Sequence, residues 1–322
     1  MPNLNVAVIG SPDYAKGIGK KSTASDITFY DVKRDDITLS LVEPTKYPEK
    51  LASLFFTASL ADVAVVVVEQ IGPAFGESVI MLDCVGVKKG YIVTKGYITR
   101  DQIAPLIKDT VLEGYSLFED DPVQLRERLL IQAREDLVGG VAANDSTGSV
   151  PVDHYFDVKG VGAVILGCVA DGVIRKHDTV KVHPLGREAE IRSIQKHDDD
   201  FDLAKKGDRV GLALKGVSVS DLERGTVLSN DATLIKNSEI VARVHLVKYW
   251  LNPLKEGMVL HIGHWMQFEP ARVESVDAGG DWRNPEVRLK LQKDLVYHTG
   301  AKAVVSYLEG GKLRIIGTLE LR

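Results

Sequence analysis

The chain has 322 residues, enough for two or three domains, and its composition of 44% hydrophobic and 26% charged residues excludes a chain dominated by disorder. A formal net charge of -5 argues against charge-driven coating of DNA or of an anionic membrane. Its two cysteines, Cys84 and Cys168, lie far apart in the sequence and predict a reduced intracellular protein without a disulfide framework or a cysteine metal site.

The start of the chain is the first feature that bears on location. A predicted strand begins almost at once, which leaves no room for a secretory leader, and no apolar run is long enough to span a bilayer. We therefore expect a cytoplasmic protein. Nothing in the sequence demands more than a monomer.

The first 140 residues alternate short apolar runs with helix-length segments. Strands are predicted at 5–10, 62–68 and 90–95, and helices at 48–60, 77–87, 99–111 and 121–135. Runs so rich in Val and Ile suit strands that are buried on both faces of a parallel sheet. The alternation predicts an α/β domain over 1–140. The Gly-, Ser- and Asn-containing stretch 139–149 then predicts a linker, placed at 141–150.

The second half of the chain reads as β structure throughout. Glycines interleave with apolar residues over 155–174, which predicts bulges and tight corners of a barrel. The stretch 178–195 alternates with period two around a turn and predicts a hairpin. Similar short strands continue to the end, so we predict one β-barrel over 151–235 and another over 236–322.

A phosphate-loop pattern stands in "VAVIGSPDYAKGIGKKST" near the start. Gly10 and Lys16 have the spacing of GxxxxGK[ST], but Ala15 stands where the second glycine belongs and Gly17 where the Mg²⁺-binding hydroxyl belongs. Two readings stay open. The first is a weak anion site built from Gly10, Asp13, Lys16 and amides at the start of a helix. The second is a longer loop that uses Gly19, Lys20, Lys21, Ser22 and Thr23.

The order of domains and one long motif carry a resemblance to a known family. The run "VDHYFDVKGVGAVILGCVADGVIRKHDTVKV", followed in order by "RSIQKH", "KKGDRVGLALKGV" and "LERGTVL", resembles domain two of translational GTPases such as EF-Tu. The chain is most similar to the SelB branch, the selenocysteine-specific elongation factors, and to archaeal SelB-like paralogues of the EF-Pyl type. The resemblance implies a P-loop GTPase-like α/β domain followed by two β-barrels. The mRNA-reading C-terminal domain of SelB is expected to be absent.

The family's GTPase motifs are altered in this sequence. Its DTPGH motif aligns with "VEPTK", so Val42 replaces the Mg²⁺-holding Asp and Thr45 the γ-phosphate-sensing Gly. Its guanine-reading NKxD motif aligns with "TKGY", which keeps Lys95 but replaces the Asp by Tyr97. The stretch between loop and strand is too short for an effector segment. We therefore expect no cofactor and degraded GTPase motifs, with Mg²⁺ and GTP in a rearranged loop as the alternative.

The resemblance also implies an aminoacyl site in domain two. The family builds it from an Asp, a neighbouring basic residue and an Arg, which are Asp153, His154 and Arg224 here. A His and an Arg would make an electropositive site that a carboxylate steadies. The alternative is a structural ion pair between Asp153 and Arg224 at the rim of the barrel.

The family's third domain binds the tRNA backbone through phosphate contacts. Candidates for these contacts are Lys248, Lys255, Arg272, Arg288 and Lys290, and the alternative is an ordinary solvated surface. The sequence thus predicts a SelB-like factor that binds an aminoacyl-tRNA, with the ribosome as a further partner. Rival hypotheses are a GTPase with a rearranged loop and a regulatory scaffold that binds other proteins.

Overall fold

A seven-stranded sheet forms the first domain in the computed structural model, which describes residues 3–138 and 146–322. Its strands are β1 (Asn3–Ile9), β2 (Lys20–Ala24), β3 (Thr28–Arg34), β4 (Ile37–Glu43), β5 (Val63–Val68), β6 (Lys89–Thr94) and β7 (Ser116–Phe118), in the order β2-β3-β4-β1-β5-β6-β7. The strands from β4 to β7 in that order run parallel, and β3 and β2 continue the sheet antiparallel. The predicted buried strands are all present.

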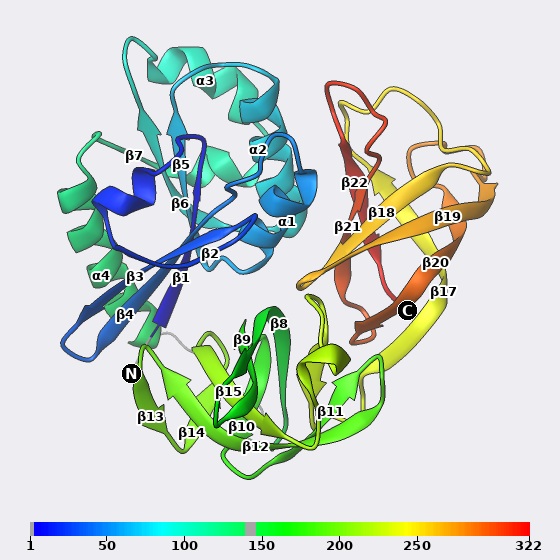
Figure 1. Ribbon diagram of the computed structural model, residues 1–322. Helices are drawn as coiled ribbons and strands as arrows, with labels where there is room; N and C mark the ends of the chain where they lie inside the picture. Colours follow the sequence, from blue (N-terminus) through cyan, green and yellow to red (C-terminus); the bar gives the residue numbers. More distant parts are fainter. Residues whose placement is uncertain (1–2, 139–145) are drawn as a thin grey trace.

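Helices cover both faces of this sheet (Figure 1). They are α1 (Leu51–Ser59), α2 (Pro73–Val85), α3 (Arg100–Ile107) and α4 (Pro122–Val138), with short 3₁₀ turns at Tyr14–Gly17 and Val111–Gly114. Apolar side chains of α1 and α2 pack on one face of the sheet, and those of α4 pack on the other. Within the described part, no helix is long and apolar enough to cross a membrane.

The phosphate-loop region folds differently from the expectation. The loop after β1 leads into a single 3₁₀ turn rather than a helix, because glycines at positions 17 and 19 disfavour a continued helix. The chain then forms the hairpin of β2 and β3. Lys20, Lys21, Ser22 and Thr23 therefore lie in an edge strand, and the longer loop expected from these residues is not formed.

The second domain is a closed barrel, as predicted. Among the described residues it contains β8 (Gly148–Val158), β9 (Gly162–Cys168), β10 (Asp171–Arg175), β11 (Thr179–His183), β12 (Arg187–Lys196), β13 (Asp199–Phe201), β14 (Leu203–Lys205), β15 (Arg209–Lys215) and β16 (Val227–Ser229). Strands β8, β16, β11, β12, β15 and β9 pair in a ring that returns to β8. The predicted hairpin is β11–β12. Of the predicted linker, 141–145 lies outside the described residues, and β8 already begins at Gly148.

The third domain is another closed barrel. Its strands are β17 (Ile235–Leu246), β18 (Val259–His264), β19 (Gln267–Asp277), β20 (Glu286–Tyr297), β21 (Lys302–Ser306) and β22 (Ile315–Glu320), closed in the order β17-β20-β19-β18-β21-β22. The multidomain fold predicted from the sequence, an α/β domain followed by two barrels, is confirmed.

The first domain contacts both barrels (Figure 1). The apolar core beneath α1 and α2 continues into the third domain, where Phe55 and Phe268 have ring centroids 5.5 Å apart. Asn5 reaches the second domain by donating to the carbonyl oxygen of Gly207 at 2.9 Å. The tip of the β2–β3 hairpin also contacts the second barrel, through Ser25 and Asp26.

Candidate functional site

The loop after β1 passes very close to strand β5. Gly10 has a φ of +105°, and a Cβ atom there would lie 2.1 Å from the carbonyl oxygen of Val67. Only glycine fits this backbone position. The loop therefore keeps the tight start that a phosphate loop needs.

A buried carboxylate accepts hydrogen bonds from backbone amides of this loop. Glu43, at the end of β4, is only 5% exposed. Its Oε1 accepts from the backbone N–H of Ala15 at 2.7 Å, and its Oε2 from that of Asp13 at 3.1 Å. Backbone amides of this kind are the donors that a bound phosphate requires. A side chain of the protein itself is thus the anion that these two amides bind.

Burial raises the pKa of the Glu43 carboxyl, although the two loop amides work in the opposite direction. Tyr30, on the neighbouring strand, donates its hydroxyl to the Asp13 carboxylate at 3.2 Å. The base of the site is therefore rich in acidic groups, an environment that disfavours a phosphate.

A cavity of about 430 Å³ opens above Glu43, at the carboxyl ends of β1, β4 and β5. Ligands of open α/β sheets bind at this edge. Among the residues expected to bind nucleotide, Gly10, Asp13 and Lys21 line it. Ala74 and Ser78 of α2 line its other side. The remaining candidates in this stretch, Lys16, Gly19, Lys20, Ser22 and Thr23, are not part of the lining.

Lys95 lies beside the cavity in an ion pair with Glu69. Its Nζ is 2.9 Å from Glu69 Oε1 and 3.2 Å from Ser11 Oγ. Ser11 in turn donates to Glu69 at 2.6 Å, and the hydrogen bonds from Ser11 and Lys95 lower the pKa of the Glu69 carboxyl. Tyr97, two residues further on, is fully exposed to solvent. Lys95 thus braces the loop through Ser11.

Sequence reasoning missed both glutamates. Glu43 ends a strand that is buried along its whole length, and Glu69 directly follows another buried strand. An acid at the carboxyl end of a buried parallel strand was the available signal, because such ends meet at one edge of the sheet.

The two glutamates predict opposite pH dependences. Glu43 has a raised pKa in the folded state, so its contribution to stability is present below the ordinary glutamate pKa and is lost as pH rises through the raised value. Glu69 has a lowered pKa, so its contribution is present at neutral pH and is lost as pH falls. The two contributions are measured as the difference in the free energy of unfolding between the wild type and each of Glu43→Gln and Glu69→Gln. Urea unfolding at several pH values between 4 and 8 gives these differences. With rising pH, the wild type loses stability relative to Glu43→Gln and gains it relative to Glu69→Gln. If the two free-energy differences changed with pH in the same direction, this account would be contradicted.

The three residues expected at the aminoacyl site lie together, but they do not pair as expected. Asp153 is fully buried, and both its carboxylate oxygens accept from the guanidinium of Arg209. Arg209 also stacks on the ring of Phe29, 3.6 Å from its centroid. Arg224 instead donates its Nε to the backbone carbonyl of Asp153 at 3.0 Å. The ion pair considered between Asp153 and Arg224 is therefore wrong, and Arg209 is the partner that the sequence did not indicate.

The Asp153 carboxylate positions the neighbouring histidine. His154 Nδ1 lies 2.7 Å from Asp153 Oδ1, which leaves Nε2 directed away from the barrel core. Burial works against the ionisation of Asp153, but the charge and hydrogen bonds of Arg209 and His154 outweigh it, so the pKa of this carboxyl is lowered. Asp153 is a support for the site rather than a surface that a ligand reaches.

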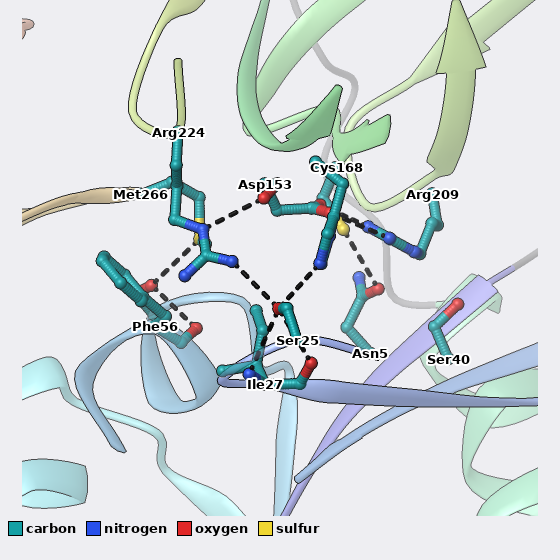
Figure 2. Close-up of polar contacts among 12 residues, drawn as sticks. Asn5, Ser25, Ile27, Ser40, Phe56, Asp153, Cys168, Arg209, Arg224 and Met266 are labelled. Carbon is teal, nitrogen blue, oxygen red and sulfur yellow. Dashed lines mark hydrogen bonds and ion pairs between the residues drawn. The ribbon is translucent and has the colours of Figure 1, made fainter. Parts of the chain in front are cut away.

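The tip of the β2–β3 hairpin covers the exposed side of this group. Ser25 Oγ lies 2.8 Å from His154 Nε2 and accepts from Arg224 Nη2 at 3.1 Å. Asp26 accepts from Arg224 Nη1 at 2.6 Å. Figure 2 shows Ser25 on the first domain, facing Asp153 and Arg224 of the second barrel. This turn was not foreseen, since a hairpin was not predicted here.

The candidate phosphate contacts of the third barrel are partly brought together. Arg272 and Lys290 are register partners on β19 and β20, and Arg288 lies two residues before Lys290 on the same exposed face. Lys290 pairs with Glu239 of β17 at 2.6 Å, and Lys248 pairs with Asp109 of the first domain at 3.1 Å. The fifth candidate, Lys255, is exposed in the segment between β17 and β18.

Comparisons with known proteins agree with this architecture. Residues 162–229 match the family model of elongation factor Tu domain 2. The chain is 35% identical to an uncharacterised protein of Methanocaldococcus jannaschii, with the whole of both chains covered. It is 25% identical over 285 residues to the selenocysteine-specific elongation factor of the same organism, covering 83% of this chain and 61% of that relative's length.

Solved structures show the same fold. The translation elongation factor SelB of Methanococcus maripaludis, in complex with the GTP analogue GppNHp, superimposes with a TM-score of 0.81 at 23% identity, covering 100% of this chain and 79% of that one. A bacterial selenocysteine-specific elongation factor, EF-Sec, gives a TM-score of 0.80 at 20% identity, with 100% and 58% covered.

Proposed function

Because the chain belongs to the translational GTPase superfamily of EF-Tu and SelB, and is SelB-like within it, we propose that it binds an aminoacyl-tRNA without a GTP switch. The observation that carries this proposal is the carboxylate of Glu43 on the amides of the phosphate loop. The scaffold of a tRNA-binding factor is retained, while the nucleotide site holds an anion of its own. Such a factor would act in the cytoplasm, with the ribosome as a further partner.

The residues at the loop do not fit a magnesium nucleotide. A phosphate on this loop would have to displace Glu43 from the N–H groups of Asp13 and Ala15. Gly17 offers no hydroxyl for Mg²⁺. The edge strand β2 uses the residues that a longer loop would need. These observations favour a binding protein over an enzyme with a rearranged loop.

Two surfaces support a tRNA ligand. Arg272, Arg288 and Lys290 share the exposed face of β19 and β20, where they can contact phosphates along a helix. His154 and Arg224 lie together around Asp153 at the rim of the second barrel, where they can make hydrogen bonds with the aminoacylated end. A protein with a net charge of -5 can still bind RNA through such local basic surfaces.

Titration with aminoacylated and deacylated tRNA tests the proposal. We expect tighter binding of the aminoacylated form, because only that form brings an ester carbonyl and an aminoacyl group to the second-barrel site. The double variant Arg272→Ala/Arg288→Ala should weaken binding of all tRNAs. It should also lower the slope of log Kd against the logarithm of the salt concentration by about 1.4 to 1.8, the value for two phosphate contacts. Lys312→Ala, in the exposed segment before β22, is the matched control and should change neither. Equal failure to bind both forms of tRNA would contradict the proposal.

A further inference from the structure

The tip of the β2–β3 hairpin pairs the outward-facing polar groups of the second barrel with its own side chains. Asp26 neutralises Arg224, and Ser25 contacts both Arg224 and His154. The side chains of Asp26 and Arg224 are 20% and 21% exposed, so their ion pair is partly shielded from solvent. A hydroxyl and a carboxylate thus occupy the place at which a ligand would meet these two side chains.

The receiving side of this contact is built without the hairpin tip. Asp153 is held by Arg209, and it fixes His154 through Nδ1. Arg224 is anchored by its Nε on the backbone of Asp153. None of these bonds involves residue 25 or 26. When the tip withdraws, Nε2 of His154 and the guanidinium of Arg224 remain in place and face outward. This lowers the entropy cost of binding a new ligand, because these groups are already ordered.

The hairpin tip can withdraw without disturbing the core. Strand β2 lies at the edge of the sheet and pairs only with β3, with a register shift between Lys21 and Ala24. Ile27 is completely buried in the first domain and anchors the far side of the turn. Only the residues between the register shift and Ile27 therefore have to move. The bonds at the tip that this movement breaks are one partly exposed ion pair, the hydrogen bonds of Ser25, and the bond that the backbone N–H of Lys46 donates to the carbonyl oxygen of Asp26 at 3.1 Å.

We propose that Ser25 and Asp26 form an autoinhibitory plug, which withdraws when the aminoacylated 3′ end of an RNA binds His154 and Arg224. This inference rests on the proposed function. The ribose hydroxyls of that end can replace the Ser25 hydroxyl at His154 Nε2, and its ester carbonyl and terminal phosphate supply acceptor oxygens for Arg224, as the plug does. The ligand affinity is therefore reduced by the fraction of molecules in which the plug is closed.

The test compares Asp26→Ala with Asp36→Ala in the full chain. Both variants remove one acidic side chain, and Asp36 lies exposed in the turn at the other end of β3. Any general effect of net charge on RNA binding is therefore common to both. Affinity is measured with a fluorescent aminoacyl-tRNA, and the opening of the turn by hydrogen exchange of a peptide that covers 22–28. Circular dichroism first establishes that both variants are folded.

We expect Asp26→Ala to bind aminoacyl-tRNA about tenfold more tightly than the wild type and to exchange faster over 22–28, while Asp36→Ala changes neither. Equal affinity of wild type and Asp26→Ala would overturn the inference but leave the proposed function standing. Weaker binding by Asp26→Ala than by Asp36→Ala would do the same. Failure of every variant to bind aminoacyl-tRNA would contradict the proposed function, and the inference with it.

Discussion

Replacement of Arg209 by Ala should lower the free energy of unfolding by about 3 to 5 kcal/mol, the usual result when one partner of a buried ion pair is removed. Asp153 is fully buried, and Arg209 supplies two of the hydrogen bonds that its carboxylate accepts. Without Arg209 the carboxylate stays in the interior, where His154 is the side chain that still hydrogen-bonds to it. Urea unfolding at pH 7 measures the loss directly.

Two further variants make this result specific. Arg192→Ala, on the exposed side of β12, should change stability by less than about 0.5 kcal/mol. The double variant Arg209→Met/Asp153→Leu should recover much of the loss, because it leaves no unpaired charge inside the protein. A loss below about 1 kcal/mol for Arg209→Ala would show that water or another group already compensates Asp153.

Replacement of Glu77 by Ala should detach the first domain from the third. Glu77, on α2, is only 4% exposed and accepts from Arg314 through the backbone N–H and Nε, both at 2.9 Å, and through Nη2 at 2.6 Å. Its removal leaves a shielded arginine without its counter-ion, at an expected loss of about 3 to 5 kcal/mol. Thermal unfolding measures this loss, and small-angle scattering should show a larger radius of gyration.

The neighbouring residue provides the control for this interface. Gly76 lies on the exposed side of the same helix, and a Cβ atom there would meet no other atom within 4 Å. Gly76→Ala should leave the scattering curve unchanged and stabilise the protein by about 0.5 to 1 kcal/mol, because alanine favours the helix. Unchanged dimensions and stability in Glu77→Ala would contradict the assigned role of the ion pair.

The sequence revealed the fold well where local patterns decide the structure. Strand β5 consists of Val and Ala alone, and β1 ends in the run Val-Ala-Val-Ile; such runs are recognisable because both of their faces are buried. The barrels were recognisable from alternation, glycine spacing and the motif that now matches elongation factor Tu domain 2. The hairpin of β2 and β3 was missed because β2 is short, polar and exposed along most of its length.

The sites were harder to predict because long-range contacts build them. Arg209 and Asp153 are 56 residues apart, and Ser25 and His154 are 129 residues apart. Residue spacing along one strand carries no information about such partners. The resemblance indicated Asp153, His154 and Arg224, but only the folded chain shows that Arg209 neutralises Asp153 and that Asp26 neutralises Arg224.

The absence of a nucleotide switch is the central claim of this account. It is tested most directly by the affinity for one aminoacyl-tRNA, measured at constant Mg²⁺ with GTP, with GDP and without nucleotide. Because Glu43 already occupies the amides of Asp13 and Ala15, we expect the same affinity under all three conditions. Binding that needs GTP, and that GDP abolishes, would contradict this account and would mean that Glu43 leaves the loop to admit a nucleotide.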